Sequence, residues 1–89
     1  SAVAGALRGY KEINLRGMKL VNDGGFLVTC SCSQHVLPPM FQQMLLDAQK
    51  DARVQLRQVE WRTQGRDHPI LASSPETQYL KCGIYQVFR

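Results

Sequence analysis

Eighty-nine residues, of which 44% are hydrophobic and 20% charged, suffice for one small globular domain or for a piece of a larger one. No apolar run approaches the roughly 18 residues that span a bilayer, and three cysteines without the spacing of a small disulfide-rich domain predict a reduced, cytoplasmic chain. Eleven basic against seven acidic residues give a net charge of +4, which fits either a polyanionic partner such as RNA or a merely basic surface.

The first half of the chain is predicted to form a helix, a strand and a second helix. Apolar residues recur at mostly helical spacing from Ala2 to Val21, and the Asn-Asp-Gly-Gly sequence that follows favours a helix end and a tight turn. Phe26–Ser31 is rich in strand-forming residues and apolar on both faces at its start, which is typical of a buried parallel strand. Two prolines open the second helix, which extends from Pro38 to about Ala52.

The second half is predicted to form two further strands joined by a long loop. Val54–Arg62 alternates like a strand, but the phase of its apolar residues slips, which indicates a bulge or an early strand end. Thr63–Gln78 is polar and too long for a simple hairpin turn, so it is a candidate functional loop. Tyr79–Phe88 is the predicted final strand.

This order of elements predicts an α/β fold with a three-stranded mixed sheet. A strand-helix-strand connection favours parallel pairing, whereas the last strand follows without a helix and can return antiparallel. Such a sheet has a bare edge at Phe26–Ser31, and an unpaired edge of this kind favours self-association.

Two cysteines lie close together near the end of the first predicted strand. Cys30 and Cys32 share one face of an extended strand and Thr29 and Ser31 share the other, a geometry that disfavours a disulfide between the two cysteines. Their spacing does not match the usual arrangement of zinc ligands, so no metal site is predicted. Cys82 fits the role of a small core residue. Cys30 lies at the carboxyl end of the strand, where open α/β sheets bind ligands, and is either a functional thiol or core filler.

Two stretches of the chain resemble a known family. RGYKEINLRGMKLVNDGGFLVTCSCSQHV and DHPILASSPETQYLKC are similar to the C-terminal half of the catalytic domain of class I S-adenosylmethionine-dependent RNA methyltransferases, closest to the PUA-containing cytosine-C5 methyltransferases of large-subunit ribosomal RNA. The resemblance implies a fragment of a Rossmann-like fold in which the last strand lies between the other two. It also implies that residues 1–89 are an incomplete domain that lacks the cofactor-binding half. We therefore assign no cofactor-binding residue here and expect the isolated fragment to be inactive.

The resemblance also implies a chemical role for Cys30. Thr29-Cys30-Ser31 is similar to the Thr-Cys-Ser motif that carries the nucleophile of RNA cytosine-C5 methyltransferases. In that reaction a thiolate adds to C6 of cytosine, which makes C5 nucleophilic enough to accept a methyl group. S-adenosylmethionine is the expected cofactor of the intact parent protein, RNA is its expected partner, and Cys32 is assigned to support or packing.

Six further residues are candidates for binding the RNA substrate. Gln34 and His35 follow the strand and face the RNA side of the cleft, or else pack against the second helix. His68 could orient the base or carry a proton, or pin the loop through local hydrogen bonds. Lys81 is a candidate phosphate contact. The remaining candidates are the hydroxyl residues Thr29 and Ser31. The alternative function is a small basic RNA-binding or dimerising interaction module with structural cysteines.

Overall fold

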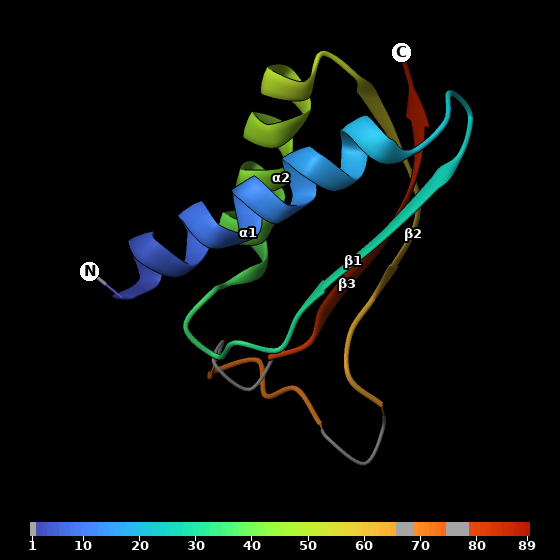
Figure 1. Cartoon of the computed structure of the whole chain (residues 1–89). Coiled ribbons are helices and arrows are strands. Elements are labelled where there is room, and N and C mark those ends of the chain that lie inside the picture. The colour runs from blue at the N-terminus through green and yellow to red at the C-terminus, as the bar shows by residue number, and fades with distance from the viewer. Residues whose placement is uncertain (1, 66–68, 75–78) are drawn as a thin grey trace.

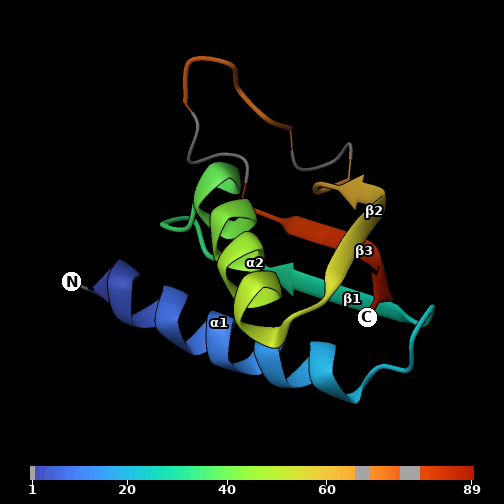
Figure 2. The ribbon, with the colours of Figure 1, turned by 90° about the horizontal axis from the view of Figure 1, so that it is seen from above.

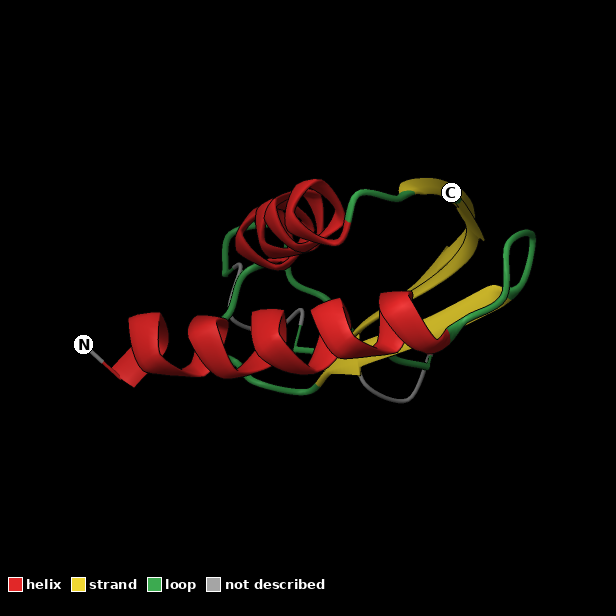
Figure 3. Cartoon of the chain, turned by 45° about the horizontal axis from the view of Figure 1, so that its top comes forward, coloured by secondary structure: helices red, strands yellow, loops and turns green. Residues whose placement is uncertain are grey.

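The described part of the chain forms two helices packed on one side of a three-stranded sheet. A computed structural model of the protein describes residues 2–65, 69–74 and 79–89. Figures 1 and 3 show that both helices lie against the same face of the sheet. The predicted order of elements is confirmed, and the elements are α1 (Ala2–Leu20), β1 (Phe26–Ser31), α2 (Pro38–Ala52), β2 (Gln55–Arg62) and β3 (Lys81–Phe88).

The sheet has the strand order β1-β3-β2, so the last strand lies between the other two, as the resemblance implies (Figure 2). Both ladders are antiparallel, so the predicted antiparallel direction of the last strand is confirmed, whereas the description of the sheet as mixed is wrong. β1 and β2 do run in the same direction, as their helical connection favours, but β3 separates them. Within the described residues β1 is consequently an edge strand, not the buried parallel strand that its composition indicates.

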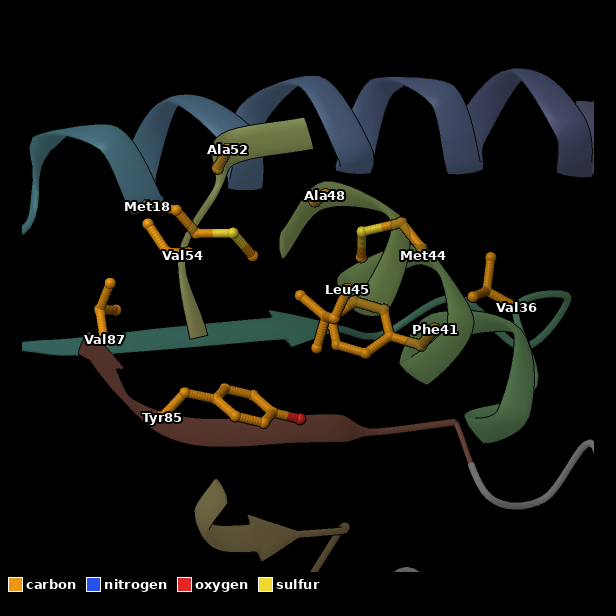
Figure 4. Close-up of a cluster of buried hydrophobic side chains, with 10 residues drawn as sticks. All are labelled: Met18, Val36, Phe41, Met44, Leu45, Ala48, Ala52, Val54, Tyr85 and Val87. Carbon is orange, nitrogen blue, oxygen red and sulfur yellow. The ribbon is translucent and has the colours of Figure 1, made fainter. Parts of the chain in front are cut away.

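The core lies between the helices and the sheet. Phe41 of α2 is fully buried, and its ring packs edge-on against Tyr10 of α1 and at a tilt against Trp61 of β2, with centroids 6.0 and 6.3 Å apart. This ring therefore joins both helices to the sheet. Figure 4 shows the buried hydrophobic side chains around it, which are Met18, Val36, Met44, Leu45, Ala48, Ala52, Val54, Tyr85 and Val87.

A bulge in β2 confirms the predicted slip of its apolar phase. Leu56 and Trp61 both pack against the core, although they lie five positions apart and would therefore be on opposite faces of a regular strand. The ladder with β3 shifts register between Gln58 and Glu60, which adds the extra residue that returns Trp61 to the helix side.

The end of α1 is held by the last residue of the chain. The guanidinium of Arg89 donates hydrogen bonds to the backbone carbonyls of Met18 and Lys19, at 3.2 and 2.9 Å, and to that of Val21. Carbonyls in the last turn of a helix have no partner within the helix and lie at the negative end of its dipole. Arg89 thus fixes the end of β3 beside the end of α1.

The sheet face opposite the helices is open. Phe26 and Val28 of β1 are 60% and 61% exposed, and Cys30, two positions further, is exposed as well. The side chains of Thr29 and Ser31 alternate with them and are buried on the helix side. β1 thus has apolar residues on both faces, as predicted, but the described residues cover only one of these faces.

Candidate active site at the carboxyl end of β1

Cys30 and Cys82 form a disulfide across the two strands. They are directly opposite each other in the β1–β3 ladder, with Cα atoms 4.1 Å apart, and the bond links positions 52 residues apart in the sequence. The predictions that Cys82 fills the core and that the cysteines are all reduced are therefore wrong. The pairing depends on the register between two distant strands, which the local pattern of residues around each cysteine does not contain.

Cys32 is the free thiol of this structure. All three cysteines are among the described residues, and Cys32 is the one outside the disulfide. It follows the last residue of β1 and is exposed. The carboxyl end of β1 therefore carries two sulfur atoms of different status, one in a disulfide with β3 and one available for chemistry.

Thr29 and Ser31 do not share the open face with Cys30. Their exposed fractions are 8% and 3%, and the Ser31 hydroxyl donates a hydrogen bond to the Tyr10 hydroxyl of α1 at 3.1 Å. The same Ser31 oxygen accepts a hydrogen bond from the backbone N–H of Ser33 at 3.3 Å. In this structure both residues are thus buried and Ser31 is hydrogen-bonded, and the expected contact of the two with the substrate stays a prediction.

Lys81 is the most unexpected member of this region. Its side chain is fully buried, and its ammonium donates a hydrogen bond to the backbone carbonyl of Ser33. Burial lowers the pKa of Lys81, and the charge of the nearby Cys32 acts in the opposite direction. The phosphate contact expected of Lys81 stays a prediction, although its side chain has no exposed surface in this structure. Sequence reasoning missed its burial, since lysine is among the residues that are most rarely buried in proteins.

Gln34 and His35 are exposed, and their contact with the substrate stays a prediction. The backbone N–H of His35 donates a hydrogen bond to the Ser33 hydroxyl at 3.3 Å, which tightens the connection between β1 and α2. A hollow of about 390 Å³ lies beside this connection. Its lining comes from the first turns of α1 and from the connection itself, and consists of Ala2, Val3, Ala6, Ser33, His35 and Val36. His68 lies outside the described residues.

A larger hollow, of about 490 Å³, lies between the two helices. Its lining includes Leu7 and Lys11 of α1 and Met40 and Asp47 of α2. None of the described candidate site residues contributes to it. We therefore place the candidate site at the smaller hollow, which adjoins the free thiol along the chain.

The described residues contain no group of three or more histidine, cysteine and acidic side chains that could hold a metal ion. Neither α1 nor α2, the helices of the described region, is long and apolar enough to cross a membrane.

The fold resembles part of one solved structure. The crystal structure of SMU.776, a protein described as a candidate methyltransferase and solved in complex with SAH, superposes with a TM-score of 0.80 at 10% sequence identity. The matched region covers 90% of this chain and 20% of SMU.776. At this identity the likeness concerns the fold alone.

Sequence relatives carry a more specific name. Ribosomal RNA large subunit methyltransferase I of Erwinia tasmaniensis is 47% identical over 77 residues, which are 86% of this chain and 19% of the relative. The proteins of the same name from Cronobacter sakazakii and Escherichia coli O1:K1 / APEC are 44% and 43% identical over 81 residues, or 91% of this chain and 20% of each relative. The chain thus spans about a fifth of the length of these relatives, and no protein-family model matches it.

Proposed function

We propose that this chain is the C-terminal segment of an S-adenosylmethionine-dependent methyltransferase that modifies C5 of cytosine in large-subunit ribosomal RNA in the cytoplasm. The observation that carries the proposal is the 43–47% identity to ribosomal RNA large subunit methyltransferase I over 86–91% of the chain. The fold shared with SMU.776 and the net charge of +4 support it.

The described residues do not by themselves fit the cofactor. A nucleotide-like ligand in this type of fold is held by a glycine turn between a strand and a following helix. The Gly24-Gly25 turn of this chain leads from a helix into β1 instead, and it lies at the opposite end of β1 from the thiols. We therefore propose that the cofactor is held by other parts of the parent protein, so that this segment alone is inactive and its contribution is a thiol.

A thiol is what the proposed reaction requires at this place. Cytosine C5 is a weak nucleophile until a thiolate adds to C6, because the new S–C6 bond pushes electron density onto C5. After C5 has gained its methyl group, loss of the C5 proton restores the double bond and expels the thiolate. The thiol must therefore be exposed, close to the RNA and outside any disulfide when the catalytic cycle begins.

Two cysteines at the end of β1 are candidates for this thiol. The resemblance assigns Cys30, which can act only when its bond to Cys82 is reduced. Cys32 is the second candidate, because it is exposed and free in the structure. Titration with a thiol reagent gives the state of the pair directly. We expect one reactive thiol in the untreated chain and three after reduction.

Single substitutions in the full-length parent separate the two candidates. We expect Cys30→Ser or Cys32→Ser, whichever removes the nucleophile, to lower methyl transfer to ribosomal RNA by about 1,000-fold or more. Cys82→Ser is the matched control, because it breaks the disulfide but frees the Cys30 thiol. If both single variants methylate RNA at the wild-type rate, the covalent mechanism is excluded and another base or position must be the target.

The open sheet face favours one alternative function, that of a dimerising interaction module. Phe26 and Val28 are exposed on β1, whose outer edge has no strand partner among the described residues. If this chain self-associates through that edge, sedimentation velocity should show a species that grows with concentration. Val28→Lys should abolish that species, because a charge on an edge strand opposes pairing. A monomer at every concentration would exclude the alternative.

A further inference from the structure

A fully buried lysine lies beneath the connection between β1 and α2. An ammonium group loses much hydration free energy on burial and is retained in a protein interior only where hydrogen bonds or opposite charge compensate it. Lys81 has no exposed surface, and no described acidic side chain lies within ion-pair distance of its nitrogen. The carbonyl of Ser33 is the hydrogen-bond partner that the structure shows for it. Among the described residues, this backbone carbonyl is thus the group that compensates the buried charge.

Lys81 interacts with the residues directly before and directly after Cys32 in the sequence. Lys81 is the cross-strand partner of Ser31, the residue before Cys32, and its ammonium binds the carbonyl of Ser33, the residue after it. The hydroxyl of Ser31 accepts the N–H of Ser33 and is itself anchored to Tyr10 of α1. The backbone on either side of the free thiol is thus fixed by one network, and Lys81 is its charged member.

The charge of a second group, Cys32, also acts on the Lys81 ammonium. Burial lowers the pKa of Lys81, and among the surrounding groups it is Cys32, in its anionic form, that favours the charged ammonium.

We propose that Lys81 is a positioning residue for Cys32: it holds the turn through the Ser33 carbonyl and places positive charge beside the sulfur. The inference deepens the proposed function, on which it rests for the claim that this turn borders the reacting base. It predicts that the Cys32 thiolate, and any anion that approaches it, lies in a positive field. An RNA phosphate near the target base would experience the same field.

The test compares two reagents that alkylate Cys32 and differ in charge. Iodoacetamide is neutral and iodoacetate is an anion, and both react with the thiolate, so the ratio of their rate constants cancels any change in the thiolate fraction. The rates at Cys32 are followed by peptide mass spectrometry in the protein as it stands. We expect Lys81→Met to lower the iodoacetate-to-iodoacetamide ratio by about two- to fivefold. Lys81→Arg should preserve the ratio, because it keeps the charge.

Lys19→Met is the matched control. It removes the same charge from an exposed position at the end of α1, which Figure 1 shows at the far end of the sheet from the β1–α2 connection. The ratio should remain at the wild-type value. A purely structural role for Lys81 would change both rate constants by the same factor and leave the ratio unchanged, and that outcome in a folded Lys81→Met variant overturns the proposal.

A salt titration of the wild-type protein decides the question if Lys81→Met does not fold. A field from Lys81 makes the ratio fall as ionic strength rises from about 0.05 to 0.5 M, and this fall must also appear in the Lys19→Met variant. A ratio that does not depend on salt overturns the proposal. These results are independent of RNA methylation: a changed ratio together with full methylation by Cys32→Ser would retain the role of Lys81 but exclude Cys32 as the nucleophile.

Discussion

The two faces of the sheet are made by the same three strands but have different surroundings. On the helix side, Tyr85 and Val87 of β3 are 6% and 0% exposed and meet the side chains of α1 and α2. On the opposite side, Phe26 and Val28 are as apolar but 60% and 61% exposed. An apolar side chain on a strand can therefore be buried, but whether it is buried depends on which elements pack on its face of the sheet. The free energy of folding should come mainly from the helix side.

The largest expected effect is the difference in the free energy of unfolding between two aromatic truncations, one on each face of the sheet. Phe41→Ala removes a fully buried ring that touches both Tyr10 and Trp61, and should lower the free energy of unfolding by about 3–5 kcal/mol. Phe26→Ala removes the same ring from the open face and should cost less than about 1 kcal/mol. Urea denaturation of both variants gives the comparison. Equal losses would mean that the open face is covered in solution.

The sequence predicts features that depend on local spacing better than features that depend on distant segments. Residues that repeat with a regular period, such as Met44 and Ala48 on α2, identify their helix and its buried face from local spacing alone. The slip in β2 is also local, because Leu56 and Trp61 lie in one strand. The order β1-β3-β2 was accessible only through the resemblance, since the rules for connections allow other positions for a strand that follows a long loop.

The candidate site was harder to predict than the fold because its contacts are long-range. The disulfide of Cys30 with Cys82, and the bond from Lys81 to Ser33, join segments 52 and 48 positions apart. Both depend on the register of β1 against β3, and a shift of one residue would reverse the face of every side chain involved. Local spacing placed Cys30 on its strand correctly but could not identify what lies opposite it.

A second prediction concerns the close approach of backbone and ring on the covered face. Gly83 lies under the side chain of Tyr85, and a Cβ added to it would overlap the Tyr85 ring. Gly83→Ala must displace this buried ring and should lower the free energy of unfolding by about 1–3 kcal/mol. Gly9→Ala is the control, because a Cβ there meets nothing within 4 Å and the helix should gain up to about 1 kcal/mol.

A double-mutant cycle shows whether the ring is the cause. Tyr85→Ala removes the obstacle, so adding Gly83→Ala to it should cost much less than Gly83→Ala costs alone. Additive losses would mean that the alanine disturbs the strand itself and that the contact with Tyr85 is not the reason for glycine at this position.

A third, smaller effect is expected at the end of α1, away from both faces. Arg89→Gln removes a charge that binds the carbonyls of Met18 and Lys19 in the last turn of α1 and that of Val21 just beyond it, and should lower the free energy of unfolding by about 1–2 kcal/mol. Thermal unfolding followed by circular dichroism measures it. Arg57→Gln, at an exposed position on β2, is the control for the loss of one positive charge. If the two variants unfold alike, Arg89 is not a functional helix cap.

The smallest expected effects come from two buried titratable groups of the covered face, which act in opposite directions. Burial lowers the pKa of Lys81 below 10.5, so on alkaline titration the folded chain loses this proton before the unfolded chain does. The unfolded state then binds more protons, and stability rises with pH from the folded pKa up to about 10.5. Burial raises the pKa of Tyr85 above 10.0, so the unfolded chain loses that proton first and stability falls above pH 10.

Substitution of each group isolates its contribution. In a Cys32→Ser background, which prevents thiol exchange with the Cys30–Cys82 bond at high pH, Lys81→Met should remove the rise and leave a curve that only falls. Tyr85→Phe should remove the part of the fall above pH 10 that comes from this phenol. The measurement is the free energy of unfolding in urea at intervals from pH 8 to 11. An unchanged curve in the Lys81→Met variant would mean that the lysine is hydrated in solution and not buried beneath the turn. Loss of the Lys81 proton increases the stability of the folded protein only if the ammonium is desolvated in the folded state.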